Sequence, residues 1–222
     1  MDELEKSYLE LAEYLDLSVQ QIMEIPITYN SANVYEFKDT KEGVENLYKD
    51  FSRVTPEFLK LLLWTSNTQR PKDILSFLKK TKDKKCLDFG SGVGTHSLIL
   101  AENHNEVVSV DLEGPLQDFF KFRAKSRGLD INFFNIVPEL KEYFDVLVCL
   151  DVLEHIYSPF DCFIELVYTL KIGGYLLLEI GEMTNDKMGH FCYINKQIKD
   201  KLWNYIDKYY TKEKEGIYVK RW

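Results

Sequence analysis

Short apolar runs alternate with helix-like segments along the second half of the chain. Five runs of strand length cover residues 86–90, 106–111, 131–136, 143–151 and 173–180. Segments of helical periodicity lie near 94–103, 115–127 and 159–170, and we expect Gly173 and Gly174 to end the last of these helices. Strands buried on both faces have continuous apolar runs, and helices between them make parallel crossovers. The pattern predicts an α/β fold with a doubly wound, mostly parallel sheet.

Residues 1–80 instead show helical patterns only. One apolar stripe along an acidic helix is formed by Leu4, Tyr8, Leu11 and Leu15. Ser18 and Gln21 match a capping box, and Thr55 before a proline starts a helix that we expect to end near Trp64. Residues 26–46 contain Pro, Asn, Ser and Gly and are expected to form a loop. We therefore divide the chain into a helical N-terminal extension, 1–80, and a sheet domain, 81–222.

The last forty residues predict one helix and one strand. Apolar residues share a helix face at Ile194, Ile198, Leu202, Ile206 and Tyr209. The segment 216–222 has the pattern of a single strand, which we expect at the edge of the sheet.

Composition and charge exclude several classes of protein. Apolar residues make up 45% of the 222 and charged residues 29%, as in folded globular domains. No apolar run approaches the roughly 20 residues that span a bilayer, and the acidic N-terminus lacks a secretory h-region, so we expect a cytoplasmic protein without membrane insertion. A net charge of −8 opposes binding to phosphate backbones, so no nucleic-acid partner is expected. The four cysteines show no CxxC spacing, and no metal site is predicted.

A glycine-rich turn follows the first apolar run. Its glycines are Gly90, Gly92 and Gly94, which gives G-x-G-x-G before a helix. Closely spaced glycines let backbone amides approach a ligand at a helix N-terminus, although this signal is weak by itself. The spacing differs from the G-x-G-x-x-G of nicotinamide and flavin proteins, and no G-K-[ST] of a P-loop follows.

An acidic residue, Asp111, ends the second run 21 residues after Gly90. A carboxylate at this spacing accepts hydrogen bonds from the two hydroxyls of a ribose. The alternative is a turn residue at the end of a strand, and the glycine turn upstream favours nucleoside binding.

Together, LDFGSGVG, Asp111, FDVLVCLDVLEHI and LKIGGYLLLEI resemble class I S-adenosylmethionine-dependent methyltransferases. The resemblance covers about residues 84–180, and the LEH triplet is similar to the branch that contains quinone and sugar-amine methyltransferases. It implies a Rossmann-like sheet that binds S-adenosylmethionine and releases S-adenosylhomocysteine. The implied cofactor-binding residues are Asp88, Gly90, Ser91, Gly92, Thr95, Asp111, Leu112, Asn135, Leu150 and Asp151. Asn135 departs from the pattern, because this fold often has an aspartate there.

Two histidines are candidate catalytic residues. His155 follows the fourth strand, where ligands bind in such sheets, and either acts as a base or serves with Glu154 to hold the following segment. His190 follows the fifth strand and is either an acceptor-side residue or a surface histidine.

Aromatic residues of the extension form either a lid over the acceptor or the contacts that bury the extension. They are Tyr29, Tyr35, Phe37, Tyr48, Phe51 and Trp64.

The first hypothesis for function is methyl transfer from S-adenosylmethionine to oxygen or nitrogen of a small molecule. The alternatives are a methyltransferase for a peptide or carrier-bound substrate and a non-catalytic binding subunit of the same fold. A non-catalytic subunit is expected to have lost its glycines or its ribose-binding acid, and this chain keeps both. Neither the acceptor nor an oligomeric state follows from the sequence.

Overall fold

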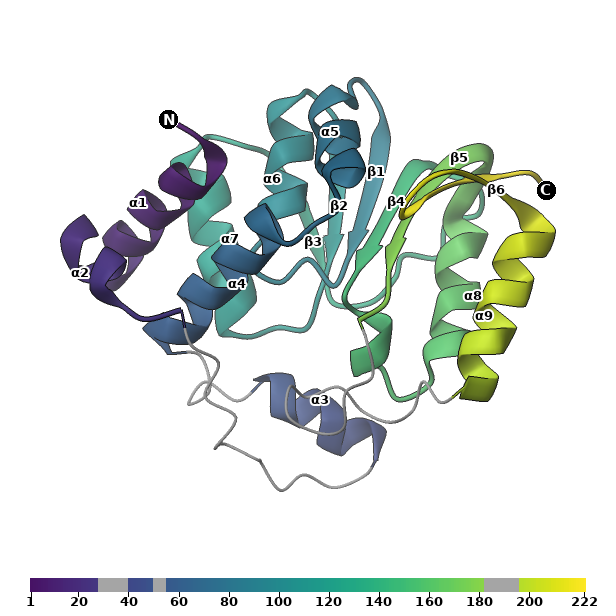
Figure 1. The fold of residues 1–222 in the computed structure, drawn as a ribbon, viewed down its shortest axis with the longest axis horizontal. Coiled ribbons are helices and arrows are strands. Elements are labelled where there is room, and N and C mark those ends of the chain that lie inside the picture. Colours follow the sequence, from purple (N-terminus) through teal and green to yellow (C-terminus); the bar gives the residue numbers. More distant parts are fainter. Residues whose placement is uncertain (28–39, 50–54, 182–195) are drawn as a thin grey trace.

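A seven-stranded sheet forms the centre of the computed structural model, which describes residues 1–27, 40–49, 55–181 and 196–222. Its strands are β1 (Lys85–Phe89), β2 (Glu106–Val110), β3 (Asn132–Phe134), β4 (Phe144–Leu150), β5 (Leu170–Glu179), β6 (Tyr210–Lys214) and β7 (Ile217–Lys220). The order in the described sheet is β3-β2-β1-β4-β5-β7-β6 (Figure 1). The pairs among β1 to β5 are parallel, and β7 runs antiparallel to both of its neighbours. The predicted α/β fold with a mostly parallel sheet is confirmed.

Helices cover both faces of the sheet (Figure 1). One face packs against α8 (Pro159–Thr169) and α9 (Lys196–Tyr209). The other packs against α5 (Lys72–Lys80), α6 (Thr95–Glu102) and α7 (Pro115–Ser126). Strand residues alternate between the two layers, as Cys86 and Leu87 of β1 do, because successive side chains of a strand point to opposite faces. Both faces are therefore apolar, which explains the continuous apolar runs of the sequence.

The N-terminal helices form a third apolar cluster beside the sheet. It joins α1 (Glu3–Leu15), α2 (Val19–Glu24) and α4 (Pro56–Thr68) to Phe119 of α7 and to Val93. Tyr8 and Leu11 of the predicted stripe are buried in it. The N-caps predicted at Ser18 and Thr55 are present. This cluster places α1 against the glycine-rich turn that follows β1.

Two predictions about the N-terminal helices are wrong in detail. Helix α4 continues to Thr68, four residues past Trp64, because polar residues at its end still extend the backbone hydrogen bonding. Helix α3 (Lys41–Lys49) replaces the end of the loop predicted over 26–46. Helix α5 packs Ile74 and Leu78 into the layer of α6 and α7 on one face of the sheet, whereas α1, α2 and α4 contribute to the third cluster.

Gly173 and Gly174 do not end a helix, contrary to the prediction. Helix α8 ends at Thr169, and β5 begins at once because buried Leu170 pairs with Phe144 of β4. The next pair is Tyr175 with Val146, so the intervening residues bulge out of the ladder. Gly173 has a φ of +77° in this bulge, and a Cβ on Gly174 would lie 2.9 Å from the Lys171 carbonyl oxygen. The glycines therefore serve a β-bulge.

The C-terminal prediction of one edge strand is also wrong. Strands β6 and β7 form a hairpin through Gly216, and β7 lies inside the sheet between β5 and β6. Helix α9 matches the predicted face, with Leu202 and Ile206 buried, while Ile194 lies outside the described residues. Strand β6 was not recognisable because the four residues after Tyr210 are polar and exposed.

Candidate functional site

The three glycines after β1 occupy different surroundings. All have positive φ, +70° at Gly90, +52° at Gly92 and +79° at Gly94. A Cβ would lie 2.4 Å from Val152 at Gly90 and 2.0 Å from the Phe120 ring at Gly94, whereas at Gly92 it would meet nothing within 4 Å. Gly90 and Gly94 are thus required for packing within the protein. Gly92 presents its backbone to open space, which suits a ligand.

Asp111 follows β2 and meets the glycine turn directly. One carboxylate oxygen, Oδ2, accepts a hydrogen bond of 2.6 Å from the Gly92 N–H, and Oδ1 accepts one of 2.7 Å from Leu112. Burial raises the pKa of Asp111, and the two backbone hydrogen bonds oppose that rise. A carboxylate has about four acceptor positions, so each oriented oxygen retains capacity for one further donor.

Three predicted cofactor residues lie in the turn or in the elements that flank it, and their polar groups are bonded to the protein. The Ser91 hydroxyl is 2.7 Å from that of Ser109. Asp88 is 2% exposed and accepts a 2.6 Å bond from Ser97, and its burial raises its pKa to about 6. The buried Thr95 hydroxyl lies 2.9 Å from the hydroxyl of Ser66 on α4. These hydrogen bonds fix the turn to β2, α6 and α4.

The edge at β2 and β3 carries the two residues expected near the adenine. Leu112 is half-buried beside Asp111, and Asn135 is exposed just after β3. The Asn135 amide donates a 2.7 Å hydrogen bond to Glu113, which follows Leu112 in the chain. The parallel pairing of β2 and β3 brings their ends together, and this amide–carboxylate contact joins the residues that follow them.

At the end of β4, Asp151 forms an ion pair that the sequence did not predict. Leu150 is buried, and Asp151 has a φ of +54° and binds the guanidinium of Arg70. Arg70 also donates a 2.9 Å hydrogen bond to Glu179 at the end of β5. It comes from the turn between α4 and α5, and its Nε has no partner among the described residues. Sequence reasoning missed Arg70 and Glu179 because their partners are distant in the chain.

The LEH triplet forms the short 3₁₀ helix η2 (Leu153–His155). Glu154 is fully buried, and its Oε1 accepts a 2.6 Å hydrogen bond from the Gly181 N–H just after β5. Burial raises the pKa of Glu154 to about 7, and its Oε2 has no partner among the described residues. His155 is half-buried at the end of η2. Through this hydrogen bond, Glu154 fixes the backbone of the segment that follows β5.

A further histidine lies at the start of α6. His96 is 8% exposed, and its Nε2 is unpartnered in the part of the chain that the structure describes. Burial, followed by the charge of Arg70, lowers its pKa to about 3, so the imidazole is neutral.

Some predicted residues lie outside the described part. They are His190 and, from the aromatic set, Tyr29, Tyr35, Phe37 and Phe51, and the side chain of Tyr48 is likewise not described. Trp64 is half-buried on α4.

Comparisons with known proteins agree with this architecture. Residues 87–178 match the family model described as a methyltransferase domain. The chain is 29% identical over 134 residues to a ubiquinone biosynthesis O-methyltransferase of Coxiella burnetii, across 59% of this chain and 52% of that protein. It is 32% identical over 97 residues to the protein of the same name from Stutzerimonas stutzeri, across 41% of each. The chain therefore spans about half the length of the first of these curated relatives.

Solved structures share the fold. A putative S-adenosyl-L-methionine-dependent methyltransferase of Methanococcus maripaludis aligns over 83% of this chain and 94% of that chain, with 16% identity and a TM-score of 0.50. Phosphoethanolamine N-methyltransferase 1 of Haemonchus contortus aligns over 81% of this chain and 44% of that chain, with 15% identity and a TM-score of 0.52.

The family match and the fold agree on what this chain is similar to. Residues 87–178, less than half of the chain, are similar to a methyltransferase domain, and the sheet around them has a Rossmann-like, mostly parallel architecture. The resemblance drawn from the sequence motifs is confirmed.

Among the described residues, no helix combines the length and the apolar character that crossing a membrane requires.

Proposed function

We propose that this chain transfers a methyl group from S-adenosylmethionine to oxygen or nitrogen of a small molecule. One observation carries the proposal: the Asp111 carboxylate and the open backbone of Gly92 lie within 2.6 Å of each other, at the carboxyl edge of the sheet. Ligands of open α/β sheets bind at this edge. The family match to a methyltransferase domain supports the choice of cofactor.

The residues present fit this cofactor at both of its ends. Asp111 would accept bonds from the ribose hydroxyls, with Leu112 packed against the adenine and Asn135 near its amine. At the methionine end, the Arg70 side chain is only 9% exposed, and its Nε is unpartnered among the described residues. A guanidinium pairs well with a carboxylate, and the cofactor's amino-acid end carries one. Asp151, bound to Arg70, would accept from the cofactor's ammonium group.

When bound, the cofactor supplies an electrophilic methyl on a sulfonium. This chain contributes chiefly orientation, because holding two reactants in line contributes much of the rate enhancement in such displacements. The His155 imidazole, next to the β4 end, would take a proton from the acceptor or hold it in place, and His190 would act from the acceptor side. A general base contributes typically about 10²–10⁴-fold in rate. A loss of that size in His155→Asn would indicate that His155 takes the proton, and a smaller loss would indicate that it only holds the acceptor in place.

We propose oxygen before nitrogen as the acceptor atom, because the curated relatives are named O-methyltransferases. We further propose that the helices before the sheet form an extension that covers the acceptor, and that the protein acts in the cytoplasm. A peptide or carrier-bound acceptor and a non-catalytic binding subunit remain the alternatives to a small-molecule enzyme.

Calorimetric titration with S-adenosylhomocysteine, with NADH as control, tests the cofactor assignment. Micromolar binding of S-adenosylhomocysteine alone is the expected result. A chain that binds neither compound would favour the non-catalytic subunit. Transfer of labelled methyl from S-adenosylmethionine to phenols, amines and sugars then tests the acceptor class, with a peptide mixture as the competing substrate.

A further inference from the structure

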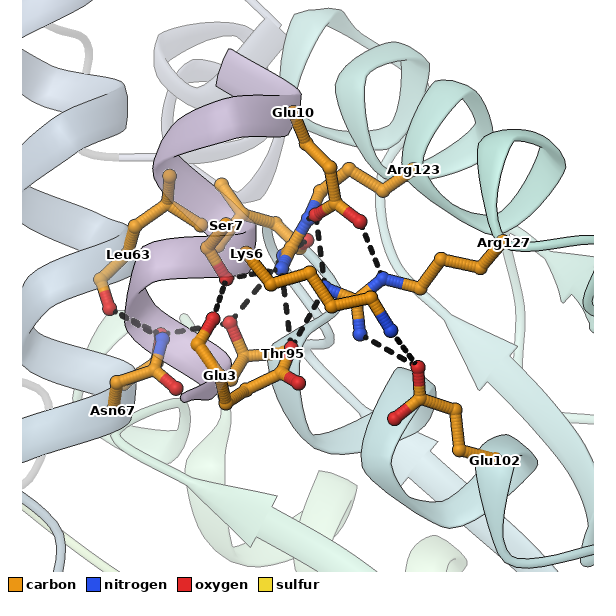
Figure 2. A network of polar contacts seen from close by, with 12 residues as sticks. Glu3, Lys6, Ser7, Glu10, Leu63, Asn67, Thr95, Glu102, Arg123 and Arg127 are labelled. Atoms are coloured by element: carbon orange, nitrogen blue, oxygen red, sulfur yellow. Dashed lines mark hydrogen bonds and ion pairs between the residues drawn. The ribbon is translucent and has the colours of Figure 1, made fainter. Parts of the chain in front are cut away.

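A buried ionic network joins the N-terminal helix to the methyltransferase domain. Figure 2 shows its centre, where Arg123 of α7 and Arg127, which caps the end of that helix, meet Glu10 of α1. Arg123 is completely buried, and Glu10 is 6% exposed. Arg127 adds contacts to Glu3, at 2.7 Å, and to Glu102 on α6, at 3.1 Å. Buried guanidinium groups need such partners, because an unpaired charge in the interior is strongly disfavoured.

Arg123 divides its donors between two parts of the chain. Its Nε donates to Glu10 at 2.7 Å, and its Nη2 donates to the Ser7 hydroxyl at 2.7 Å, both on α1. Its Nη1 donates to the Val93 carbonyl oxygen at 2.5 Å. The planar guanidinium therefore ties α1 to the glycine-rich turn through one rigid group.

Val93 is one of the residues that hold the turn, together with Gly90, whose N–H donates to the Val110 carbonyl oxygen, and Ser91, whose hydroxyl contacts Ser109. Val93 stands between Gly92 and Gly94, whose backbones lack the restraint of a side chain. Its own side chain is 4% exposed in the apolar cluster with Tyr8 and Leu11 of α1. Its carbonyl is fixed by Arg123, and the preceding residue, Gly92, donates its N–H to Asp111. The position of this N–H thus depends on the anchoring of Val93.

We propose that Arg123 is a positioning residue for the cofactor-binding turn, and that α1 holds it in position through Glu10. The inference rests on the proposed function, since it concerns affinity for the cofactor. Removing the Glu10 charge leaves the buried Arg123 with only the Glu3 carboxylate, 3.7 Å from its Nη2, so the guanidinium must shift toward Glu3 or α1 must undock. Either change releases the Val93 carbonyl and loosens the turn next to Asp111.

The test compares two carboxylate-to-amide substitutions in the same network. Glu10→Gln removes the charge that faces Arg123, whereas Glu102→Gln removes a rim contact of Arg127 and Lys6 that does not reach the turn. Dissociation constants for S-adenosylhomocysteine are measured by calorimetry on the full chain, together with melting temperatures. We expect about a tenfold or larger increase in Kd for Glu10→Gln and less than a twofold change for Glu102→Gln.

A double-variant cycle asks whether Glu10 acts through Arg123. Glu10→Gln is expected to weaken binding in the natural chain and to have no added effect in the Arg123→Met background. If the docking of α1 strengthens binding of S-adenosylhomocysteine, then binding must in turn stabilise the docked α1. S-adenosylhomocysteine is therefore expected to slow hydrogen exchange in α1 of the natural chain. If Arg123→Met does not fold, Ser7→Ala replaces it; this variant removes the Nη2 contact and the hydroxyl's bond to the Glu3 carbonyl oxygen, and is expected to raise Kd.

The outcomes separate this inference from the proposed function. A Glu10→Gln protein that melts earlier but binds S-adenosylhomocysteine as the natural chain does would overturn the positioning role and leave the proposed function standing. Equal weakening by Glu102→Gln would also overturn it. Failure of the natural chain itself to bind S-adenosylhomocysteine would refute the proposed function, and this inference with it.

Discussion

Gly92 and Gly94 lie two residues apart, yet a methyl group would meet different surroundings at each. At Gly94 it would overlap the Phe120 ring, and at Gly92 it would enter open space. We expect Gly94→Ala to lower the free energy of unfolding by about 3 kcal/mol or more. Gly92→Ala should cost only the ~1–2 kcal/mol of a left-handed residue and should weaken S-adenosylhomocysteine binding. Urea unfolding and calorimetry measure both, and equal stability losses would contradict the assignment.

Asp111 is the residue on which cofactor affinity should depend most. Asp111→Ala removes a carboxylate held by Gly92 and Leu112, and we expect a loss of ~2–5 kcal/mol in binding S-adenosylhomocysteine, about 30-fold or more. The control is Asp130→Ala, which removes an exposed aspartate. Unchanged affinity in the Asp111 variant would refute its role as the ribose ligand.

Glu154 should make stability depend on pH near neutrality. Burial raises its pKa from an ordinary 4.5 to about 7. Between these values the folded state holds a proton that the unfolded chain releases, so the free energy of unfolding falls as pH rises, by at most ~3 kcal/mol. Glu154→Gln keeps an acceptor for Gly181 and should reduce this slope, leaving the variant more stable than the natural chain above pH 7. Thermal melts from pH 5 to 8 test it, with exposed Glu139→Gln as control; an unchanged slope would refute it.

Single residues differ in how far the sequence could predict their place. The glycines and Asp111 were predictable because their spacing follows from strand, turn and helix geometry. Arg70 was not, because it lies in a polar turn and its partners, Asp151 and Glu179, are separated from it by 81 and 109 positions. Only the assembled sheet brings the ends of β4 and β5 to that turn.

At the scale of elements, Lys220 joins β7 to the end of α8. Its buried Nζ donates to the carbonyl oxygens of Val167, at 2.8 Å, and Leu170, at 2.6 Å. Lys220→Met would leave two buried acceptors without a donor, and we expect a loss of ~1–3 kcal/mol in unfolding free energy. Lys212→Met, on the exposed face of β6, is the control. Similar stability of the two variants in urea would show that the capping contact is unimportant.

Elements were predictable where burial dictated the sequence. The apolar runs of β1, β2 and β4 are buried on both faces, so their composition alone identified them. The β5 bulge and the hairpin were not predictable. Gly173 and Gly174 of the bulge also match the pattern of a helix end. Strand β6 of the hairpin is a polar edge strand with one buried residue, so it has no apolar run to identify it.

At the scale of the whole molecule, cofactor binding should stabilise the fold by mass action. S-adenosylhomocysteine at one hundred times its Kd adds about 2.7 kcal/mol to the unfolding free energy. For a chain of 222 residues, this corresponds to a rise of about 5–11 °C in melting temperature. Differential scanning calorimetry checks the shift, NADH should produce none, and equal shifts with both compounds would contradict selective binding.

The position of β7 inside the sheet constrains the order of assembly. Ribosomes complete β6 before β7, yet β6 meets the rest of the sheet only across β7. The two strands form a local hairpin, a microsecond event, and must add to β5 as a unit. Until then β5 presents an unpaired apolar edge at Tyr175–Leu177, the kind of edge that promotes aggregation. The nascent chain is therefore most vulnerable while its cofactor-binding half is already made and its final hairpin is still in the exit tunnel.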